Sequence, residues 1–191
     1  MPSKPPPSGL YVPAVLFFDE QDLLDLKSIG AHVLRLAEVH SLYLSVLFPL
    51  QLIDADAQIT WQGGVTGILV QGSNGEAQHL SHEERSQAIS VTRKMLNDNG
   101  FESVLVIAGT GAQSTRETIQ LCHEAKNAGA SHALVLTPST WLPAMSVDTI
   151  LKFHREVGYF PFLRSLEAAV IWSSESISLG SRVFPDSNNG L

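Results

Sequence analysis

Four times in succession, a short apolar stretch is followed by a stretch with helical periodicity, and this alternation limits the folds that the chain can adopt. The apolar stretches are typical of strands buried on both faces. They lie at residues 11–18, 67–71, 104–108 and 133–136, and the helical stretches begin near Asp22, Ser81, Ser114 and Ser146. Strands that alternate with helices form parallel sheets with right-handed crossovers. The sequence therefore predicts an α/β fold, as an open doubly wound sheet or an eight-stranded barrel.

Two of the helical stretches begin with the pattern of a capping box, in which a serine is followed three residues later by a glutamate. Ser81 is followed by Glu84, and Ser114 by Glu117. Acidic side chains in a first turn stabilise the helix dipole. We therefore interpret Glu83, Glu84 and Glu117 as helix-capping residues and not as catalytic acids.

Composition and charge exclude several classes of partner. The formal net charge of −7 and the absence of clustered Lys and Arg argue against a nucleic-acid surface. The apolar run at residues 42–53 is too short to cross a bilayer, which needs about 20 residues. No phosphate-binding glycine motif follows the first strand. The expected partners are small molecules and other copies of the chain in a homo-oligomer.

Two segments do not fit the strand–helix pattern, and they divide the chain. Residues 1–8 are expected to be a disordered tail without a targeting signal, which favours a cytoplasmic location. Residues 9–157 are expected to form one domain of strand–helix units, interrupted by an atypical insertion at 39–62 that exceeds the usual connection of about 2 to 6 residues. Residues 158–191 form a serine-rich tail. One hypothesis is that the insertion and the tail derive from retained non-coding sequence or a shifted frame.

The second apolar stretch ends at a turn, Gly72-Ser73-Asn74-Gly75, which is the best candidate for a binding site. Its backbone N–H groups can converge on an anion, and the side chains of Ser73 and Asn74 add donors. The turn would then hold a carboxylate. The alternative is a plain tight turn, because Gly, Ser and Asn are common in turns for steric reasons alone.

Four motifs in order resemble the dihydrodipicolinate synthase and N-acetylneuraminate lyase family over about 150 residues. They are residues 65–76 (VTGILVQGSNGE) with 80–85 (LSHEER), residues 106–111 (VIAGTG) with Ser114-Thr115, residues 128–130 (AGA) and residues 134–138 (LVLTP). The Gly-Ser-Asn-Gly-Glu form is most similar to the 4-hydroxy-2-oxoglutarate aldolase-like branch of the family.

This resemblance implies a TIM barrel of which the chain contains about the first four strand–helix units, a half-barrel. It also implies a class I aldolase or lyase that makes or breaks carbon–carbon bonds of 2-oxo acids such as pyruvate through a lysine Schiff base. No metal or organic cofactor is implied. Ser73 and Asn74 match the positions that bind the pyruvate carboxylate, and Gly72, Gly75 and Thr137 complete the expected substrate-binding set.

The resemblance does not include the residues that perform the covalent chemistry in the family. The family places its lysine on the sixth strand and a relay tyrosine in a Tyr-Asn-x-Pro segment after the fifth, and neither segment follows Val157. Ser139-Thr140 replaces a pair of family tyrosines. Lys4 lies in the tail, and the other lysines, Lys27, Lys94, Lys126 and Lys152, lie in helical stretches outside a barrel. No catalytic residue is therefore assigned, and the chain is expected to be inactive or impaired. The alternative is a non-catalytic half-barrel that binds a carboxylate or self-associates.

Metal and thiol chemistry are not favoured by the remaining candidates. The histidines lack metal-binding spacing, so no metal site is assigned. The sequence instead favours surface or loop positions for four of them, namely His79, His82, His123 and His132. Cys122 is expected to be a small core residue because apolar positions accompany it at helical spacing.

Overall fold

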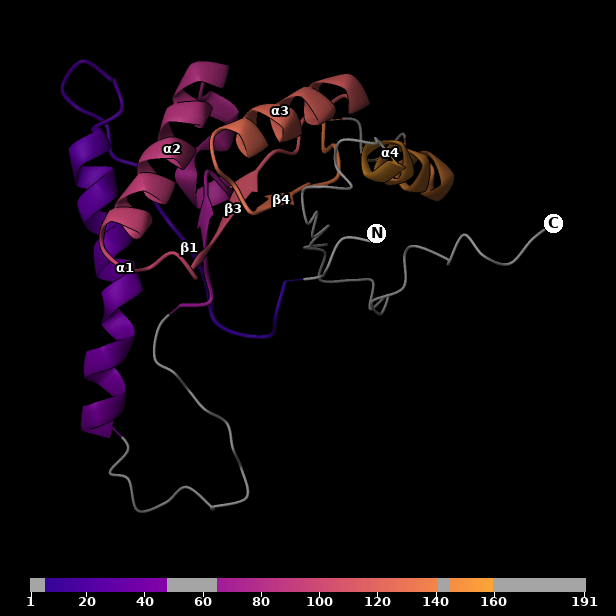
Figure 1. Cartoon of the computed structure of the whole chain (residues 1–191). Coiled ribbons are helices and arrows are strands. Elements are labelled where there is room, and N and C mark those ends of the chain that lie inside the picture. Colours follow the sequence, from indigo (N-terminus) through magenta and orange to yellow (C-terminus); the bar gives the residue numbers. More distant parts are fainter. Residues whose placement is uncertain (1–5, 48–64, 141–144, 160–191) are drawn as a thin grey trace, which may run out of the picture.

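A four-stranded parallel sheet forms the centre of the fold. The computed structural model describes residues 6–47, 65–140 and 145–159. Within them the strands are β1 (Tyr11–Pro13), β2 (Gly67–Val70), β3 (Leu105–Gly109) and β4 (His132–Leu134). They pair in chain order, β1-β2-β3-β4, and each pairing is parallel (Figure 1). The four strands therefore direct their carboxyl ends toward the same edge of the sheet.

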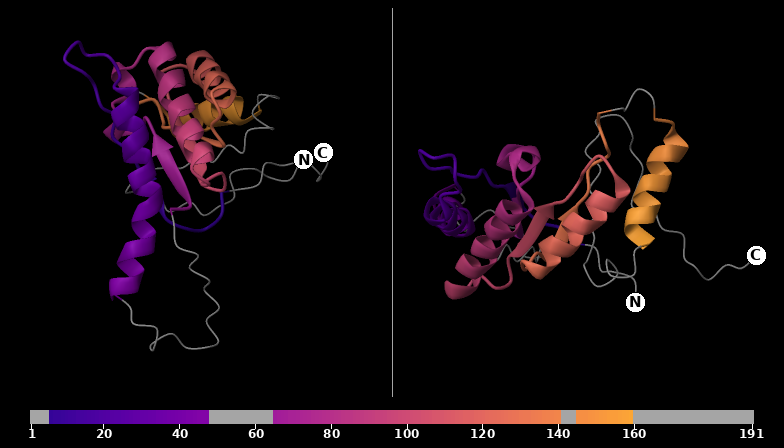
Figure 2. Two further views of the ribbon diagram at one scale, coloured as in Figure 1. Left: turned by 60° about the vertical axis from the view of Figure 1, so that its left-hand side comes forward. Right: turned by 90° about the horizontal axis from the view of Figure 1, so that it is seen from above.

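An α-helix follows each strand. The helices are α1 (Leu26–Leu47), α2 (His82–Asp98), α3 (Thr115–Asn127) and α4 (Val147–Tyr159). Each of α1 to α3 contacts the next helix along the chain, and Figure 2 shows the four helices side by side in chain order. The predicted succession of four strand–helix units is confirmed.

Apolar side chains of the strands and helices form two buried clusters. The larger cluster includes Ile68 of β2, Ile29 of α1 and Ile89 of α2, each at most 1% exposed. Full burial of one such side chain contributes about 2 kcal/mol to the free energy of folding. The smaller cluster consists of Cys122, Ala133, Val135, Phe153 and Val157. The two clusters fix α1 to α4 against the sheet that carries the glycine turn.

The first strand is shorter than the sequence predicts. The apolar stretch continues to Phe18, but β1 ends at Pro13. Phe18 forms an isolated antiparallel bridge with Leu24. Between these two residues, the Asp19 carboxylate accepts the backbone N–H of Leu23 at 3.0 Å and closes a turn. The N–H of Ala14 still donates to Leu69 of β2, so the ladder ends at Ala14 and the chain turns only after Phe18.

The first helix also differs from its prediction at both ends. It begins at Leu26 and not near Asp22, because Asp22 has a φ of 59° and the Asp25 carboxylate accepts the N–H of Ser28 at 3.0 Å, as a capping residue does. Residues 39–47, predicted to begin an insertion, belong to the end of α1. The rest of the predicted insertion up to residue 62 lies outside the described residues.

Other boundaries fall partly or wholly outside the described residues. Residues 1–5 of the predicted tail lie outside the described residues. Pro7 belongs to the described part of that tail, and its carbonyl accepts a hydrogen bond from the Tyr11 hydroxyl at 2.5 Å. Residues 158 and 159 belong to α4, and the predicted tail from 160 to 191 is not described. Within the described ranges, no helix has the length and apolar character needed to cross a membrane.

The predicted helix caps are confirmed, with one difference. Ser81 and Glu84 form a complete capping box at the start of α2. Ser114 accepts the N–H of Glu117 at 3.2 Å at the start of α3. The Glu117 carboxylate, however, contacts the His82 ring at 2.8 Å instead of returning to the cap. The pattern of a second capping box therefore gives a single-sided cap and a contact between helices.

Candidate functional site

The glycine turn, residues 72–75, begins two residues after β2. Residues Ser73–Gly75 form a short 3-10 helix, η1, and Ala77–His79 form a second, η2. Gly72 precedes η1 in an extended conformation, and its carbonyl accepts the N–H groups of Gly75 at 3.1 Å and Ala77 at 3.3 Å. The turn is therefore held by its own backbone.

Two N–H groups of the turn remain available. Among the residues that the structure describes, the N–H groups of Ser73 and Asn74 donate to no backbone carbonyl. Both residues are exposed. Adjacent N–H groups without internal acceptors are suited to bind an anion.

Backbone strain occurs on both sides of the turn. Gln71 precedes it with a φ of 48°, and Glu76 follows it with a φ of 53°. Residues other than glycine seldom adopt the left-handed region, at a cost of about 1 kcal/mol or more each. The shape of this turn therefore lowers the free energy of unfolding.

A cavity of about 200 Å³ lies beside the turn. Its wall combines the turn, η2 and the carboxyl ends of β3 and β4. The lining residues are Gln71, Gly72, Ser73, Glu76, Ala77, Gln78, His79, Gly109, Gly111, Leu134 and Leu136. The cavity is large enough for an acid of a few carbon atoms, and the Ser73 donors lie in its wall.

The five residues of the predicted substrate-binding set do not all reach the cavity. Gly72 and Ser73 line it, whereas Asn74, Gly75 and Thr137 are absent from its wall. Gly75 is buried, and a Cβ there would lie 3.2 Å from the Ala14 carbonyl oxygen. The Thr137 hydroxyl contacts the His154 ring at 3.1 Å.

A buried polar group supports the cavity wall from behind. Arg85 of α2 is only 7% exposed. Its guanidinium donates to the backbone carbonyls of Ala77, Leu80 and Gly109. The Gly109 carbonyl also accepts the side-chain N–H of Gln71 at 3.3 Å. Burial lowers the pKa of Arg85, although a guanidinium remains charged in proteins.

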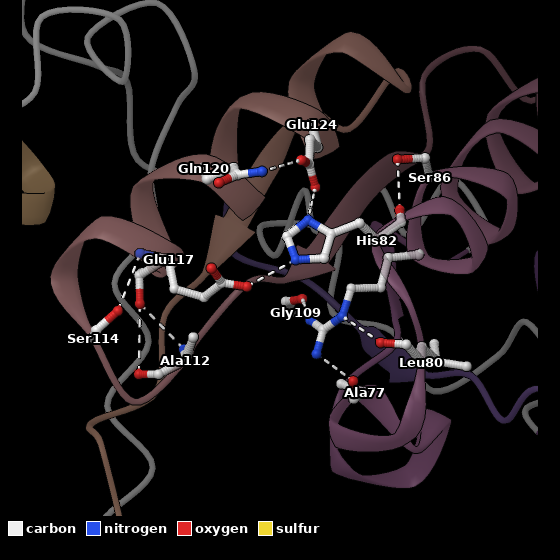
Figure 3. A network of polar contacts seen from close by, with 12 residues as sticks. Ala77, Leu80, His82, Ser86, Gly109, Ala112, Ser114, Glu117, Gln120 and Glu124 are labelled. Carbon is white, nitrogen blue, oxygen red and sulfur yellow. Dashed lines mark hydrogen bonds and ion pairs between the residues drawn. The ribbon is translucent and has the colours of Figure 1, made fainter.

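His82 joins α2 to α3 through two carboxylates. Its Nδ1 lies 2.6 Å from Glu124 and its Nε2 lies 2.8 Å from Glu117 (Figure 3). The hydrogen bond to Glu124 has the largest effect and raises the pKa of His82. Burial opposes it, and the hydrogen bond to Glu117 and the charges of both glutamates add to the rise. The side chain is 43% exposed, so the predicted surface position is confirmed, while its pairing with two glutamates was not predicted.

The remaining candidates give mixed outcomes. His132 is 1% exposed in β4, so its predicted surface or loop position is wrong. Cys122 is 0% exposed, as predicted, and burial raises the pKa of its thiol to about 11. The lysines Lys27, Lys94, Lys126 and Lys152 lie on α1, α2, α3 and α4. In the described part of the chain, no cluster of His, Cys, Asp or Glu is arranged to hold a metal ion.

The site includes three residues that the sequence did not single out as functional. Gln71, Arg85 and Gly109 were each part of a quoted motif, but without an assigned role. A Cβ at Gly109 would lie 2.1 Å from the Gln71 carbonyl oxygen, so this position requires glycine. One signal was available, because an arginine one helical turn after a helix start faces back toward the preceding loop.

The comparisons with known proteins agree on one family. The sequence model described as "Dihydrodipicolinate synthetase family" matches residues 50–157. A protein of Emericella nidulans named "Probable 4-hydroxy-2-oxoglutarate aldolase, mitochondrial" is 41% identical over 157 residues, which cover 82% of this chain and 43% of that protein. An L-threo-3-deoxy-hexylosonate aldolase of Aspergillus niger is 37% identical over 159 residues, which cover 82% of this chain and 40% of that protein.

Solved structures show the same fold over a similar part of the chain. A dihydrodipicolinate synthase family protein from Coccidioides immitis is 31% identical with a TM-score of 0.62, and the match covers 83% of this chain and 42% of that one. A dihydrodipicolinate synthase from Acinetobacter baumannii, solved with pyruvate, is 28% identical with a TM-score of 0.58, with 78% and 41% covered. The predicted partial TIM barrel is confirmed. The chain spans about two fifths of the length of these relatives.

Proposed function

Because the chain belongs to the dihydrodipicolinate synthetase family, we propose that it provides the acid-binding part of a carbon–carbon lyase that acts on 2-oxo acids such as pyruvate. Two of the relatives are named as aldolases. The observation that carries the proposal is that Ser73 lies in the cavity wall. The backbone N–H groups of Ser73 and Asn74 have no backbone acceptor among the described residues. These donors would hold the carboxylate of the acid, with Asn74 beside them.

The fixed carboxylate would orient the rest of the acid toward the ends of β3 and β4. In a class I aldolase, a lysine forms an imine with the keto group, which then accepts the electrons of the carbon–carbon bond that breaks. Holding the acid by its carboxylate aligns that bond with the imine, and such alignment lowers the activation barrier. In this proposal, residues 72–75 supply binding and orientation.

We further propose that this chain alone is inactive or impaired in bond cleavage. The four described lysines are on helices and contribute nothing to the cavity wall, and Lys4 lies outside the described residues. Where the family carries paired tyrosines, the N–H groups of Ser139 and Thr140 donate to the Gln113 side chain at 3.1 Å. Ser139 and Thr140 therefore make a structural contact.

Two measurements test the proposal. Titration with pyruvate, followed by NMR, should shift the amide signals of Ser73 and Asn74, and Ser73→Ala should weaken binding by about tenfold, as expected for a lost hydrogen bond to a charged group. Ser103→Ala is the matched control, because Ser103 is exposed and does not line the cavity. Equal weakening by both substitutions would refute the assignment of Ser73.

The second measurement addresses the covalent step. Incubation with pyruvate and borohydride, followed by mass spectrometry, should leave the mass of this chain unchanged. A reduced adduct on any lysine would overturn the proposed impairment while supporting the aldolase assignment.

A non-catalytic role is the second candidate, favoured by the open sheet. In the described residues, β1 and β4 each pair with one neighbouring strand only. Such edges can pair with another chain, so we propose a homo-oligomer. Pyruvate binding without an adduct fits either candidate. If the chain self-associates but does not bind pyruvate, the second candidate function is favoured.

The cytoplasm remains our proposed location. The name of the Emericella nidulans relative includes the word mitochondrial. Fractionation of cells that produce the chain would decide between the two compartments.

A further inference from the structure

Arg85 contacts backbone from two separate parts of the cavity wall. Its Nε lies 3.4 Å from the Leu80 carbonyl oxygen, and its Nη2 donates to the Ala77 carbonyl, so it contacts both ends of the η2 region. Its Nη1 lies 3.4 Å from the Gly109 carbonyl oxygen at the end of β3. One side chain therefore joins the segment after the glycine turn to the neighbouring strand.

The same contacts place a positive charge behind the cavity. Ala77 and Gly109, whose carbonyls receive hydrogen bonds from Arg85, both line the cavity. Arg85 makes no ion pair with an acidic side chain in the described residues, and the attraction of Glu117 and Glu124 acts over a longer range. A charge at a buried position is screened less than one at the surface. Its field favours an anion in the cavity.

We infer that Arg85 is a positioning residue for the acid-binding site: it fixes residues 77–80 against β3 and contributes a positive field to the cavity. Since η2 directly follows the glycine turn, loss of these contacts would loosen the wall that carries Ser73. The effect on ligands rests on the function proposed above, whereas the effect on the backbone does not.

Arg93 provides a matched control on the same helix. It is partly buried and donates to the carbonyls of Val104 at 2.8 Å and Phe101 at 3.2 Å. It is absent from the cavity wall and lies two helical turns after Arg85. Replacing either arginine by methionine removes a guanidinium with backbone partners, but only Arg85→Met alters the cavity.

Amide hydrogen exchange of the full chain without ligand tests the backbone effect. The amides of His79 and Leu80 are hydrogen-bonded to Glu76 and Ala77 and report on η2, while that of Val104 reports on the Arg93 contacts. We expect Arg85→Met to accelerate exchange at His79 and Leu80 by about tenfold, and Arg93→Met to accelerate it at Val104 instead. Equal acceleration at His79 and Leu80 in both variants would mean that Arg85 contributes only to global stability. That result would overturn the inference.

Pyruvate affinity, measured by titration, tests the effect on the ligand. The dissociation constant should rise about tenfold in Arg85→Met and stay within about twofold of the original in Arg93→Met. Arg85→Lys keeps the charge but not the fork of donors, so it should recover part of the affinity while exchange at His79 stays fast. Equal affinities in Arg85→Met and Arg93→Met would refute the role in ligand binding.

Two further outcomes are decisive. If the original chain does not bind pyruvate, the proposed function fails, and the exchange comparison still decides whether Arg85 positions η2. If Arg85→Met does not fold, the pair Arg85→Lys and Arg93→Lys gives the same comparison of exchange at His79 and Val104, with the same outcome overturning the inference.

Discussion

Gln71 and Glu76 have positive φ angles on either side of the glycine turn, and this strain is tolerated because the surrounding contacts determine the backbone there. The Gln71 side chain and the Arg85 guanidinium share the Gly109 carbonyl. That carbonyl belongs to a glycine at which a Cβ would collide with the Gln71 backbone. At the scale of single residues, the shape of the site therefore depends on Gly109 as much as on the turn itself.

Gly109→Ala should destabilise the chain strongly. A Cβ at this position would lie 2.1 Å from the Gln71 carbonyl oxygen, so the backbone must move to accommodate it. We expect a loss of about 3 kcal/mol in the free energy of unfolding, measured by urea denaturation. Gly72→Ala is the control, because its Cβ would meet only the flexible Leu69 side chain, with Cδ2 at 3.1 Å and Cγ at 3.4 Å. A similar loss in both variants would contradict the assigned role of Gly109.

His82 should make stability depend on pH. Its two carboxylate contacts raise its pKa above the ordinary value of 6.5, so its contribution is complete below pH 6.5 and is lost as the pH rises through the raised pKa. Because the side chain is 43% exposed, solvent screening limits the contribution to below about 1 kcal/mol. His82→Gln should therefore destabilise the chain more at pH 6 than at pH 9, as measured by thermal unfolding. A difference that is constant with pH would exclude the charged pairing.

At the scale of elements, the sequence predicted the order and type of all four strands and helices, because buried strands and helix caps leave local patterns. It failed at the ends of elements, where β1 is shorter than its apolar run. The Asp19 carboxylate closes a turn after β1, and an apolar run gives no sign of this. The role of Arg85 was missed for a related reason, since its partners are backbone carbonyls up to 24 residues away and carry no side-chain signature. The place of Ser73 beside the cavity follows from a local motif at the end of β2, whereas its role in binding stays a prediction.

The two serine caps should differ in their coupling to the glutamate that follows. In α2, the Glu84 carboxylate accepts the Ser81 N–H at 2.7 Å, whereas in α3 the Glu117 carboxylate contacts His82. Each serine-to-alanine substitution should cost about 1 kcal/mol. A double-mutant cycle for Ser81→Ala and Glu84→Ala should reveal coupling of about 0.5 kcal/mol or more.

The matching cycle for Ser114→Ala and Glu117→Ala is the control. It should give additive changes in the free energy of unfolding, because the Glu117 side chain does not return to its cap. Equal coupling in the two cycles would contradict the different roles of the two glutamates.

For the whole molecule, the two edges of the sheet are not equivalent. Ala14 donates its N–H to Leu69, so alternate residues of β1 face β2 and Pro13 faces the open edge. Proline has no N–H to offer a further strand. On β4, Leu134 accepts a hydrogen bond from Thr110, which directs the backbone of Ala133 to the other edge. The β4 edge is therefore better suited to pair with another strand, whether from this chain, a copy or a partner.

The chain should accordingly self-associate, and Pro13→Val should strengthen association by restoring an edge N–H. One added backbone hydrogen bond corresponds to a gain of about fivefold in the association constant, measured by sedimentation over a range of protein concentrations. Ser103→Ala, an exposed substitution away from both edges, should leave the constant unchanged. A monomer whose melting temperature is independent of concentration would contradict the expected association.

The burial of Cys122 has a practical consequence. It is the only cysteine of the chain, it is 0% exposed, and its thiol is almost wholly protonated at neutral pH because its pKa is about 11. Alkylating reagents react with exposed thiolates. Such a reagent therefore modifies this thiol when α3 opens away from the β4 and α4 residues that cover it. The rate of modification measures that opening, with no label or substitution introduced.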